Sequence, residues 1–340
     1  MHPPLFKIRE NGYFGFINAE GTVVIEPQFL EVDDFYNGFT TAQLNGQRAL
    51  LDAMGRLYVR RLYRAVGIFR EDLARVQVVN AWGFIDTKGK EVIPTYFDEA
   101  GDFNQGMAAV KLEGSAGYIN KNGDFVIKPV FSGSGNFHDG LAPAGVNGLW
   151  GFINQSGKFV LEPRWDAAFS FQGNVAVVVQ DTSWGLVNRL GQETIAPQFE
   201  FVKGHVQGDF FDGMALAFRD GKYGFVSQEE GAIAIEPMFD LAGDFGEGLA
   251  LVEINGAYGY VDKSGKLVIM PKFEDAGVFS EGLAQVRSNG KWGYINTEGQ
   301  IVIPATFDGA TPFRNGMALT ALEGKWVYID REQKVVWKEG

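Results

Sequence analysis

A glycine recurs along this chain at a nearly constant spacing, and it constrains the fold more than any other feature. It stands in Trp-Gly-Phe-Ile at 82–85 and 150–153, and in Trp-Gly-Tyr-Ile at 292–295. The position is held by Gly15, Gly83, Gly117, Gly151, Gly185, Gly224, Gly259 and Gly293, with Ala49 and Val327 in two further copies. Successive copies are 34 residues apart, except for steps of 39 and 35 residues on the two sides of Gly224. This periodicity predicts one tandem repeat array over residues 1–340.

The copy at residues 276–306 indicates what each repeat folds into. Apolar and polar residues alternate at 283–287, which is the period of a half-buried strand, and Asn289-Gly290 is a strong hairpin signal. A second strand at 292–295 and a third at 301–307 follow. With the short apolar stretch before the first strand, we expect an antiparallel meander of three full strands and a fourth short one. No segment has a helical period with caps, so the chain is expected to be all-β.

Two aromatic positions recur together with the glycine, and small residues after a Gly-Leu-Ala or Gly-Met-Ala turn leave room for the first of them. The first position is Phe35, Phe69, Phe103, Phe137, Phe171, Phe210, Phe245, Phe279 and Phe313. The second closes the last strand and is Phe29, Tyr63, Phe97, Phe131, Trp165, Phe199, Phe239, Phe273 and Phe307. One meander cannot bury its apolar face alone, so these aromatics are expected to form core seams between stacked repeats.

The tryptophan before the recurring glycine is interpreted as a packing residue, with ligand stacking as the alternative. In other copies Phe14, Arg48, Ala116, Tyr223 or Tyr258 replaces it.

The segments 290–296 and 255–262, with the downstream Gly and Val-Ile-x-Pro, resemble the WG-repeat family of bacterial proteins, also called KWG repeats. The resemblance spans nearly the whole chain. It implies a bacterial source and a β-rich repeat fold, and it implies no common activity and no catalytic residues. Arg48-Ala49 and Trp326-Val327 depart from the signature.

Two architectures are compatible with these repeats. Four-stranded meanders are the blades of β-propellers, although 34 residues is short for a blade and about ten blades exceed the usual number. We expect a β-propeller-like toroid, with an open β superhelix as the alternative. Extra residues near 201–208 are a candidate seam that divides the array into two runs of about five repeats.

Composition excludes several classes of protein. Cysteine is absent, which rules out disulfides and thiol chemistry, and the net charge of -12 argues against nucleic-acid and anionic-membrane binding. No run of 18 apolar residues is present to span a membrane. The start of the chain shows no basic region followed by an apolar run, so a cytoplasmic location is expected.

No catalytic, metal or cofactor motif is visible. The three histidines, His2, His138 and His205, are far apart and occupy no repeat-equivalent position. Hydrolase, phosphate-loop and metalloprotease patterns are missing. The sequence therefore predicts a protein without catalytic residues, without metal ligands and without a cofactor.

An acidic residue recurs just after the second aromatic position, at Asp98, Asp166, Glu200, Asp240, Glu274 and Asp308. The preferred interpretation is solubility together with hydrogen bonds to the N–H groups of turns. The first alternative is an acidic rim that receives a basic partner, and the second is a glycosidase-like pair of carboxylates.

The second repeat inverts this pattern. It carries six arginines, Arg56, Arg60, Arg61, Arg64, Arg70 and Arg75, while it has lost its own Trp-Gly. Ion pairing with acidic neighbours such as Asp98 or Asp33 is one interpretation. The other is a docking patch for an acidic partner, since the planar guanidinium pairs bidentately with carboxylates.

Three functions from different classes remain open. The first is a non-catalytic scaffold for protein–protein interaction, including an immunity or inhibitor protein, because repeat arrays offer large rigid surfaces. The second is a lectin-like carbohydrate-binding module that would need exposed tryptophans. The third is a propeller-type hydrolase that would need two buried acids with perturbed pKa values. We favour the scaffold, with another protein bearing an acidic patch as the partner.

Overall fold

A computed structural model describes residues 3–35, 38–44, 47–201 and 209–340, and every regular element in these ranges is a β-strand. This confirms the all-β class and the tandem array of antiparallel meanders. Within the described ranges no helix is long and apolar enough to cross a membrane. The candidate seam near 201–208 falls on residues that, except for Phe201, lie outside the described part of the chain.

The chain divides into two compact units. The first holds residues 1–172 and 178–180, and the second holds residues 173–177 and 181–340. The strands of the first unit are β1 (Phe6–Glu10), β2 (Tyr13–Ile17), β3 (Val23–Phe29), β4 (Phe39–Leu44), β5 (Gln47–Asp52), β6 (Leu57–Tyr63), β7 (Ala65–Val66), β8 (Leu73–Val78), β9 (Ala81–Asp86), β10 (Glu91–Phe97), β11 (Glu99–Ala100), β12 (Ala108–Leu112), β13 (Ser115–Ile119), β14 (Phe125–Phe131), β15 (Gly133–Ser134), β16 (Leu141–Val146), β17 (Leu149–Asn154), β18 (Phe159–Trp165) and β19 (Ala167–Ala168).

The residues of β20 (Val175–Gln180) are shared between the units, and the remaining strands belong to the second unit. These are β21 (Ser183–Asn188), β22 (Glu193–Glu200), β23 (Met214–Arg219), β24 (Lys222–Ser227), β25 (Ala232–Phe239), β26 (Leu241–Gly246), β27 (Leu249–Ile254), β28 (Ala257–Asp262), β29 (Leu267–Phe273), β30 (Asp275–Ala276), β31 (Leu283–Ser288), β32 (Lys291–Asn296), β33 (Ile301–Phe307), β34 (Gly309–Ala310), β35 (Met317–Leu322), β36 (Lys325–Asp330) and β37 (Val335–Lys338).

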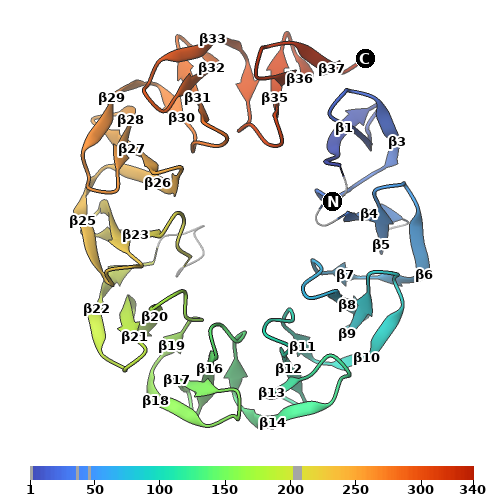
Figure 1. The fold of residues 1–340 in the computed structure, drawn as a ribbon, viewed down its shortest axis with the longest axis vertical. Helices are drawn as coiled ribbons and strands as arrows, with labels where there is room; N and C mark the ends of the chain where they lie inside the picture. Colours follow the sequence, from blue (N-terminus) through green and yellow to red (C-terminus); the bar gives the residue numbers. More distant parts are fainter. Residues whose placement is uncertain (1–2, 36–37, 45–46, 202–208) are drawn as a thin grey trace. The chain divides into compact units, whose positions relative to one another are not determined.

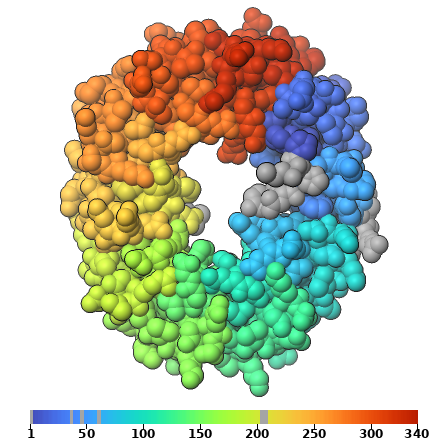
Figure 2. Space-filling model, in the orientation of Figure 1, coloured from blue at the N-terminus to red at the C-terminus, as the bar shows by residue number. Residues whose placement is uncertain are grey.

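In the described part of the chain, six repeats are four-stranded antiparallel sheets whose strands follow chain order. In the first unit β11-β12-β13-β14 and β15-β16-β17-β18 are two such sheets, and Figure 1 shows them as successive meanders. The short first strand pairs with the second, as Glu99 with Lys111, and the two central strands form a tight hairpin. Figure 2 shows the surface of this unit changing colour in chain order, so each repeat lies beside its sequence neighbours. The predicted three full strands and one short strand are confirmed.

The recurring glycine is required by a β-bulge between the third and fourth strands. In one sheet Ala116 pairs with Phe131 and Tyr118 with Ile127, so Gly117 faces the bulged residues 128–130. A Cβ atom at Gly117 would lie 2.6 Å from the carbonyl oxygen of Ile127. At all eight recurring glycines the corresponding distance is between 2.3 and 2.6 Å, which no side chain tolerates. The period of the sequence is therefore the period of this bulge.

In the last repeat Val327 fills the glycine position, and the bulge is absent there, as this explanation requires. There the outer strand β37 is only four residues long, and Val327 pairs directly with Lys338. No bulge presses a carbonyl group against it, so a branched side chain fits.

The first recurring aromatic forms the predicted seams between repeats. Seven of these nine phenylalanines pack against the ring that follows the glycine of the preceding repeat, with ring centroids 4.7 to 4.9 Å apart. Phe69 packs instead against Phe39, with ring centroids 5.0 Å apart. The pairs are Phe16–Phe35, Phe84–Phe103, Tyr118–Phe137, Phe152–Phe171, Phe225–Phe245, Tyr260–Phe279 and Tyr294–Phe313. Where the partner is tyrosine, its hydroxyl also donates to a backbone carbonyl of the next repeat, as from Tyr118 to Gly135 at 2.7 Å.

A second set of contacts between repeats was not predicted from the sequence. In the tight turn before each second strand, a residue with positive φ extends its side chain to a backbone N–H of the next such turn. Glu71 accepts from Gly106 at 3.1 Å, and Gln105 accepts from Gly140 at 3.0 Å. In the second unit the same links are Asp212 to Gly248, Glu247 to Gly282, and Glu281 to Asn315 and Gly316. These side chains link neighbouring repeats through their turns.

Candidate functional site

The six recurring acids are all exposed, and five of them accept a hydrogen bond from a turn amide about 15 to 20 residues further along the chain. The donors are the backbone N–H groups of the tight hairpin that joins the two central strands of each sheet. The pairs are Asp98 with Gly114 (3.0 Å), Glu200 with Asp220 (3.3 Å), Asp240 with Asn255 (2.8 Å), Glu274 with Gly290 (2.9 Å) and Asp308 with Glu323 (3.1 Å). The carboxylates therefore fix hairpin geometry in their own repeat.

Two of these carboxylates also pair with lysine. Lys222 donates to Asp240 at 2.5 Å, and Lys291 makes the same contact with Asp308. These lysine hydrogen bonds hold the pKa of both carboxyl groups below the ordinary value, with further lowering from the turn amides. A glycosidase acid needs the opposite shift, toward neutrality. The shift at Asp240 and Asp308 is therefore the reverse of the one that a catalytic acid needs.

Among the arginines of the second repeat, Arg56, Arg64 and Arg70 are exposed. Arg56 Nε donates to Asp52 Oδ2 at 2.7 Å, within its own turn, and Arg64 Nη1 donates to Asn80 Oδ1 at 3.0 Å. The side chains of Arg60 and Arg61 lie outside the described part of the chain.

Arg75 differs from the other arginines because it joins two repeats. Its Nη1 donates to the carbonyl oxygen of Ala100 at 2.8 Å, and its Nε lies 3.0 Å from Asp102 Oδ1. The guanidinium also lies 5.4 Å from the centre of the Trp82 ring. The acidic partner is Asp102, rather than the Asp98 or Asp33 named from the sequence.

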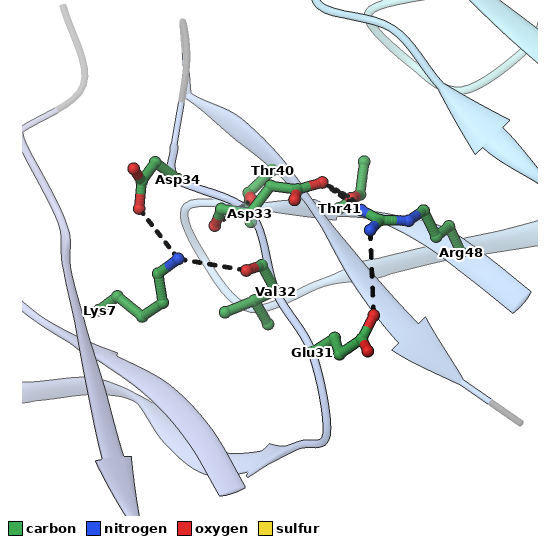
Figure 3. A network of polar contacts seen from close by, with 8 residues as sticks. All are labelled: Lys7, Glu31, Val32, Asp33, Asp34, Thr40, Thr41 and Arg48. Carbon is green, nitrogen blue, oxygen red and sulfur yellow. Dashed lines mark hydrogen bonds and ion pairs between the residues drawn. The ribbon is translucent and has the colours of Figure 1, made fainter. Parts of the chain in front are cut away.

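Arg48, which replaces the tryptophan in the second repeat, lies at the centre of a polar network (Figure 3). Its guanidinium pairs with Asp33 and donates to Thr41 Oγ1 at 2.8 Å, and Thr41 also contacts Asp33. Glu31 lies 3.9 Å away on the other side. The network joins the connection after β3, which pairs with β4, to β4 and β5, so charge takes the place of the aromatic ring within this repeat.

Two small cavities lie in the first unit. One of about 70 Å³ adjoins this network and is lined by residues that include Asp33, Thr41 and Phe69. The other, of about 230 Å³, lies beside Ala116, where the recurring tryptophan is missing.

Of the three histidines, only His138 lies in the described part of the chain, where it is exposed. Within the described ranges no three His, Asp or Glu side chains are close enough together to hold a metal ion.

An exposed apolar stripe on the outer strands is a feature that the sequence reasoning missed. In the first unit Val92, Val126 and Val160 occupy the same position of β10, β14 and β18 and are 40, 50 and 49 % exposed. Tyr96 and Val130 on the same strands are also exposed. The signal was present as the first residue of the recurring Val-Ile or Val-Leu pair, which was interpreted only as a strand. We call Val92, Val126 and Val160 the valine stripe.

The comparisons with known proteins agree with this architecture. The family model described as "WG containing repeat" matches eight times, at residues 14–47, 82–115, 117–150, 150–181, 184–223, 223–256, 258–292 and 292–326. The matches cover most of the chain. No curated protein sequence matches it.

Among solved structures, the crystal structure of a eukaryotic initiation factor is similar over all of this chain and 96 % of its own, with a TM-score of 0.55 and 12 % identity. The dihydro-heme d1 dehydrogenase NirN matches all of this chain and 75 % of its own at a TM-score of 0.43 and 10 % identity. Hsv2 of Kluyveromyces lactis matches 73 % of this chain and 88 % of its own at 0.37 and 9 %. The similarity to the initiation factor shows a shared fold and nothing about function.

Proposed function

Because this chain belongs to the WG-repeat family, a β-rich repeat array, we propose that it is a non-catalytic scaffold for protein–protein interaction. The observation that carries the proposal is the valine stripe. Apolar side chains that recur at one exposed position of successive repeats form an ordered surface, and such surfaces on soluble proteins mark interaction sites. The tight seams between repeats support it further, since they keep the surface rigid before binding.

The hydrogen bonds of the recurring acids support a role without catalysis. Five of the six recurring acids hold hairpin amides, and the pKa values of Asp240 and Asp308 are lowered by lysine contacts. A carboxyl group with a lowered pKa, as at Asp240 and Asp308, is a poor proton donor near neutral pH. A protein that binds and neutralises another protein, as an inhibitor or immunity protein does, fits this surface.

A partner with an acidic patch completes the proposal. Arg56, Arg64 and Arg70 are exposed in a chain with a net charge of -12, and exposed arginines of the opposite sign orient an incoming acidic protein. Arg75 is assigned to packing because of its contacts with Asp102 and Trp82.

The burial of the tryptophans supports the scaffold over the lectin-like alternative. Trp184 is buried and Trp150 and Trp292 are half-buried within their sheets, whereas a sugar needs an open aromatic face. Trp326, at 44 % exposure, is the most accessible one in this position of the repeat.

The proposal is tested by affinity capture from extracts of the native host, with the captured proteins quantified by mass spectrometry. A variant with Val92→Lys, Val126→Lys and Val160→Lys is compared with the unmodified chain, and we expect it to lose the captured protein.

The matched control carries Met54→Lys, Leu149→Lys and Leu190→Lys, which are exposed apolar residues outside the valine stripe. This control should retain capture. If the unmodified chain enriches no protein over a bare matrix, the scaffold function is wrong.

A further inference from the structure

The repeat that contains Ala116 lacks the aromatic ring that fills the same place in most other repeats. This position is Trp82, Trp150, Trp184, Tyr223, Tyr258 or Trp292 elsewhere. In the first unit the Trp150 ring lies across its own sheet, against Gly145 on the paired strand and Gly133 on the short strand. A Cβ atom at Gly133 would come within 2.8 Å of that ring. The equivalents of Gly145 and Gly133 in the Ala116 repeat are Lys111 and Glu99.

The place of the missing ring is a cavity of about 230 Å³. Its base is the face of the β11-β12-β13 sheet, with Ala116, Lys111 and Glu99 among the lining residues. Ser134 and Asn136 of the next repeat form part of the opposite wall. Lys111 Nζ and Glu99 Oε1 lie 3.1 Å apart at its edge. The cavity is therefore a slot between two sheets with both apolar and polar groups in its lining.

Charged residues at the rim are compatible with a ring in the slot, because another repeat has an acid and a base at the same positions beside a tryptophan. There Asp275 lies opposite Arg287 on the neighbouring strand, and Arg287 lies opposite Trp292. This is the same register as that of Glu99, Lys111 and Ala116, with the aromatic ring present. In that repeat Arg287 pairs with Glu274, at 3.9 Å.

We propose that this slot, the Ala116 slot, binds an aromatic side chain, tryptophan above all, presented by a partner protein. The occupant is argued from the chain itself, since the equivalent slots are filled by its own tryptophan and tyrosine rings. Aromatic anchors in preformed pockets carry much of the affinity of protein interfaces, because they bury a large area at a small entropic cost. Lys111 adds a cation beside the ring.

The polar end of an indole also has a partner. In another repeat Trp184 Nε1 donates to the backbone carbonyl oxygen of Glu200 at 3.2 Å. Glu200 follows the last aromatic of the outer strand, and the residue in that position after Phe131 is Ser132. The Ser132 carbonyl group is thus the expected acceptor for the N–H of a bound indole, which favours tryptophan over phenylalanine.

This inference rests on the proposed function for the source of the ring, and its first test does not require the partner. The probe is 3-methylindole, which reproduces the tryptophan side chain, titrated into the full chain and followed by nuclear magnetic resonance. We expect saturable shifts at the amides of Ser134 and Asn136. Absence of any shift there up to the solubility limit of the probe overturns the proposal, whatever any variant does.

Ala116→Trp fills the slot from within and should weaken 3-methylindole binding at least about tenfold. It should also raise the melting temperature, since it restores the residue typical of the repeat. Asn122→Trp adds a tryptophan to an exposed turn of the same sheet, outside the valine stripe, and should leave probe binding unchanged. Equal binding by wild type and Ala116→Trp would place the probe elsewhere and refute the slot.

Capture from the host separates the slot from the scaffold function. If Ala116→Trp loses the protein that wild type and Asn122→Trp retain, the partner uses the slot. If all three capture it equally, the slot has no role in binding that partner and the inference is wrong, while the scaffold function stands. If none captures a protein, the scaffold function itself fails.

Discussion

The ring of Phe279 lies 4.8 Å from the ring of Tyr260, centre to centre, and the two residues belong to successive repeats. Tyr260 also donates its hydroxyl hydrogen to the carbonyl oxygen of Gly277 at 2.7 Å. Six other pairs of successive repeats have the same aromatic contact, so this pair is an example of how neighbouring repeats pack together.

Phe279→Ala should lower the free energy of unfolding by about 3–5 kcal/mol, because it removes a buried ring and leaves a cavity at the seam. Urea denaturation followed by tryptophan fluorescence measures the change. A loss below about 1 kcal/mol would mean that the neighbouring repeats hold together without this ring.

Gly259→Ala should destabilise the protein by about 1–3 kcal/mol or more, because the new methyl group would meet the Ile269 carbonyl oxygen at 2.5 Å. Gly309→Ala is the matched control, since its methyl group would meet only Ala321, at an ordinary contact distance of 3.5 Å. The control should change stability by less than about 0.5 kcal/mol. Equal effects in thermal melts would contradict the bulge explanation.

Glu281→Ala should lower stability by about 1 kcal/mol, since the carboxylate accepts from the amides of Asn315 at 2.5 Å and Gly316 at 2.9 Å in the next repeat. Glu281→Gln keeps an acceptor and should retain most of the stability, as Gln105 does naturally at the equivalent position. Amide hydrogen exchange at Gly316 reports the link directly, and unchanged exchange in the alanine variant would show that the link contributes nothing.

Burial raises the pKa of the Tyr118, Tyr260 and Tyr294 hydroxyls above the ordinary value. A raised pKa in the folded state stabilises the protein fully below the unfolded value of about 10, and this contribution is lost as pH rises above it. The unfolding free energy should therefore fall between about pH 9 and about pH 12.

Replacing all three tyrosines by phenylalanine should reduce this alkaline loss. It should also cost about 0.5–1.5 kcal/mol per residue at neutral pH, where the hydroxyl hydrogen bonds are removed. Denaturant unfolding at neutral and at alkaline pH measures both effects. If the triple variant loses as much unfolding free energy at alkaline pH as wild type does, groups other than these tyrosines cause the loss.

Reversing the charge of Arg64 and Arg70 to Glu should abolish capture of an acidic partner while changing the melting temperature little, because both are exposed. Arg56 is left unchanged because it pairs with the buried Asp52. The matched control reverses Lys128 and Lys158, which are exposed lysines elsewhere in the first unit, and so changes the net charge equally. Capture that survives the arginine reversal would remove the acidic partner from the proposal.

The repeat period, the meander and the aromatic seams could be predicted from the sequence because each depends on local order. Alternation, Asn-Gly turns and a fixed period determine which strands pair within one repeat, and a single meander that cannot bury its apolar face must stack on the next. Asp98 and its equivalents were likewise predicted to hold turn amides, because carboxylates near turns find N–H groups close in the chain.

The sequence alone determined the fold of one repeat and its repetition along the chain. Only the tertiary structure decided the contacts between repeats. The pairing of Arg75 with Asp102, the links from Glu71 to Gly106, and the slot beside Ala116 all depend on distances between separate sheets. Local periodicity does not encode those distances, because they arise when the seams bring neighbouring sheets together. The missing ring at Ala116 was visible as a substitution, but only the packed neighbours make it a cavity.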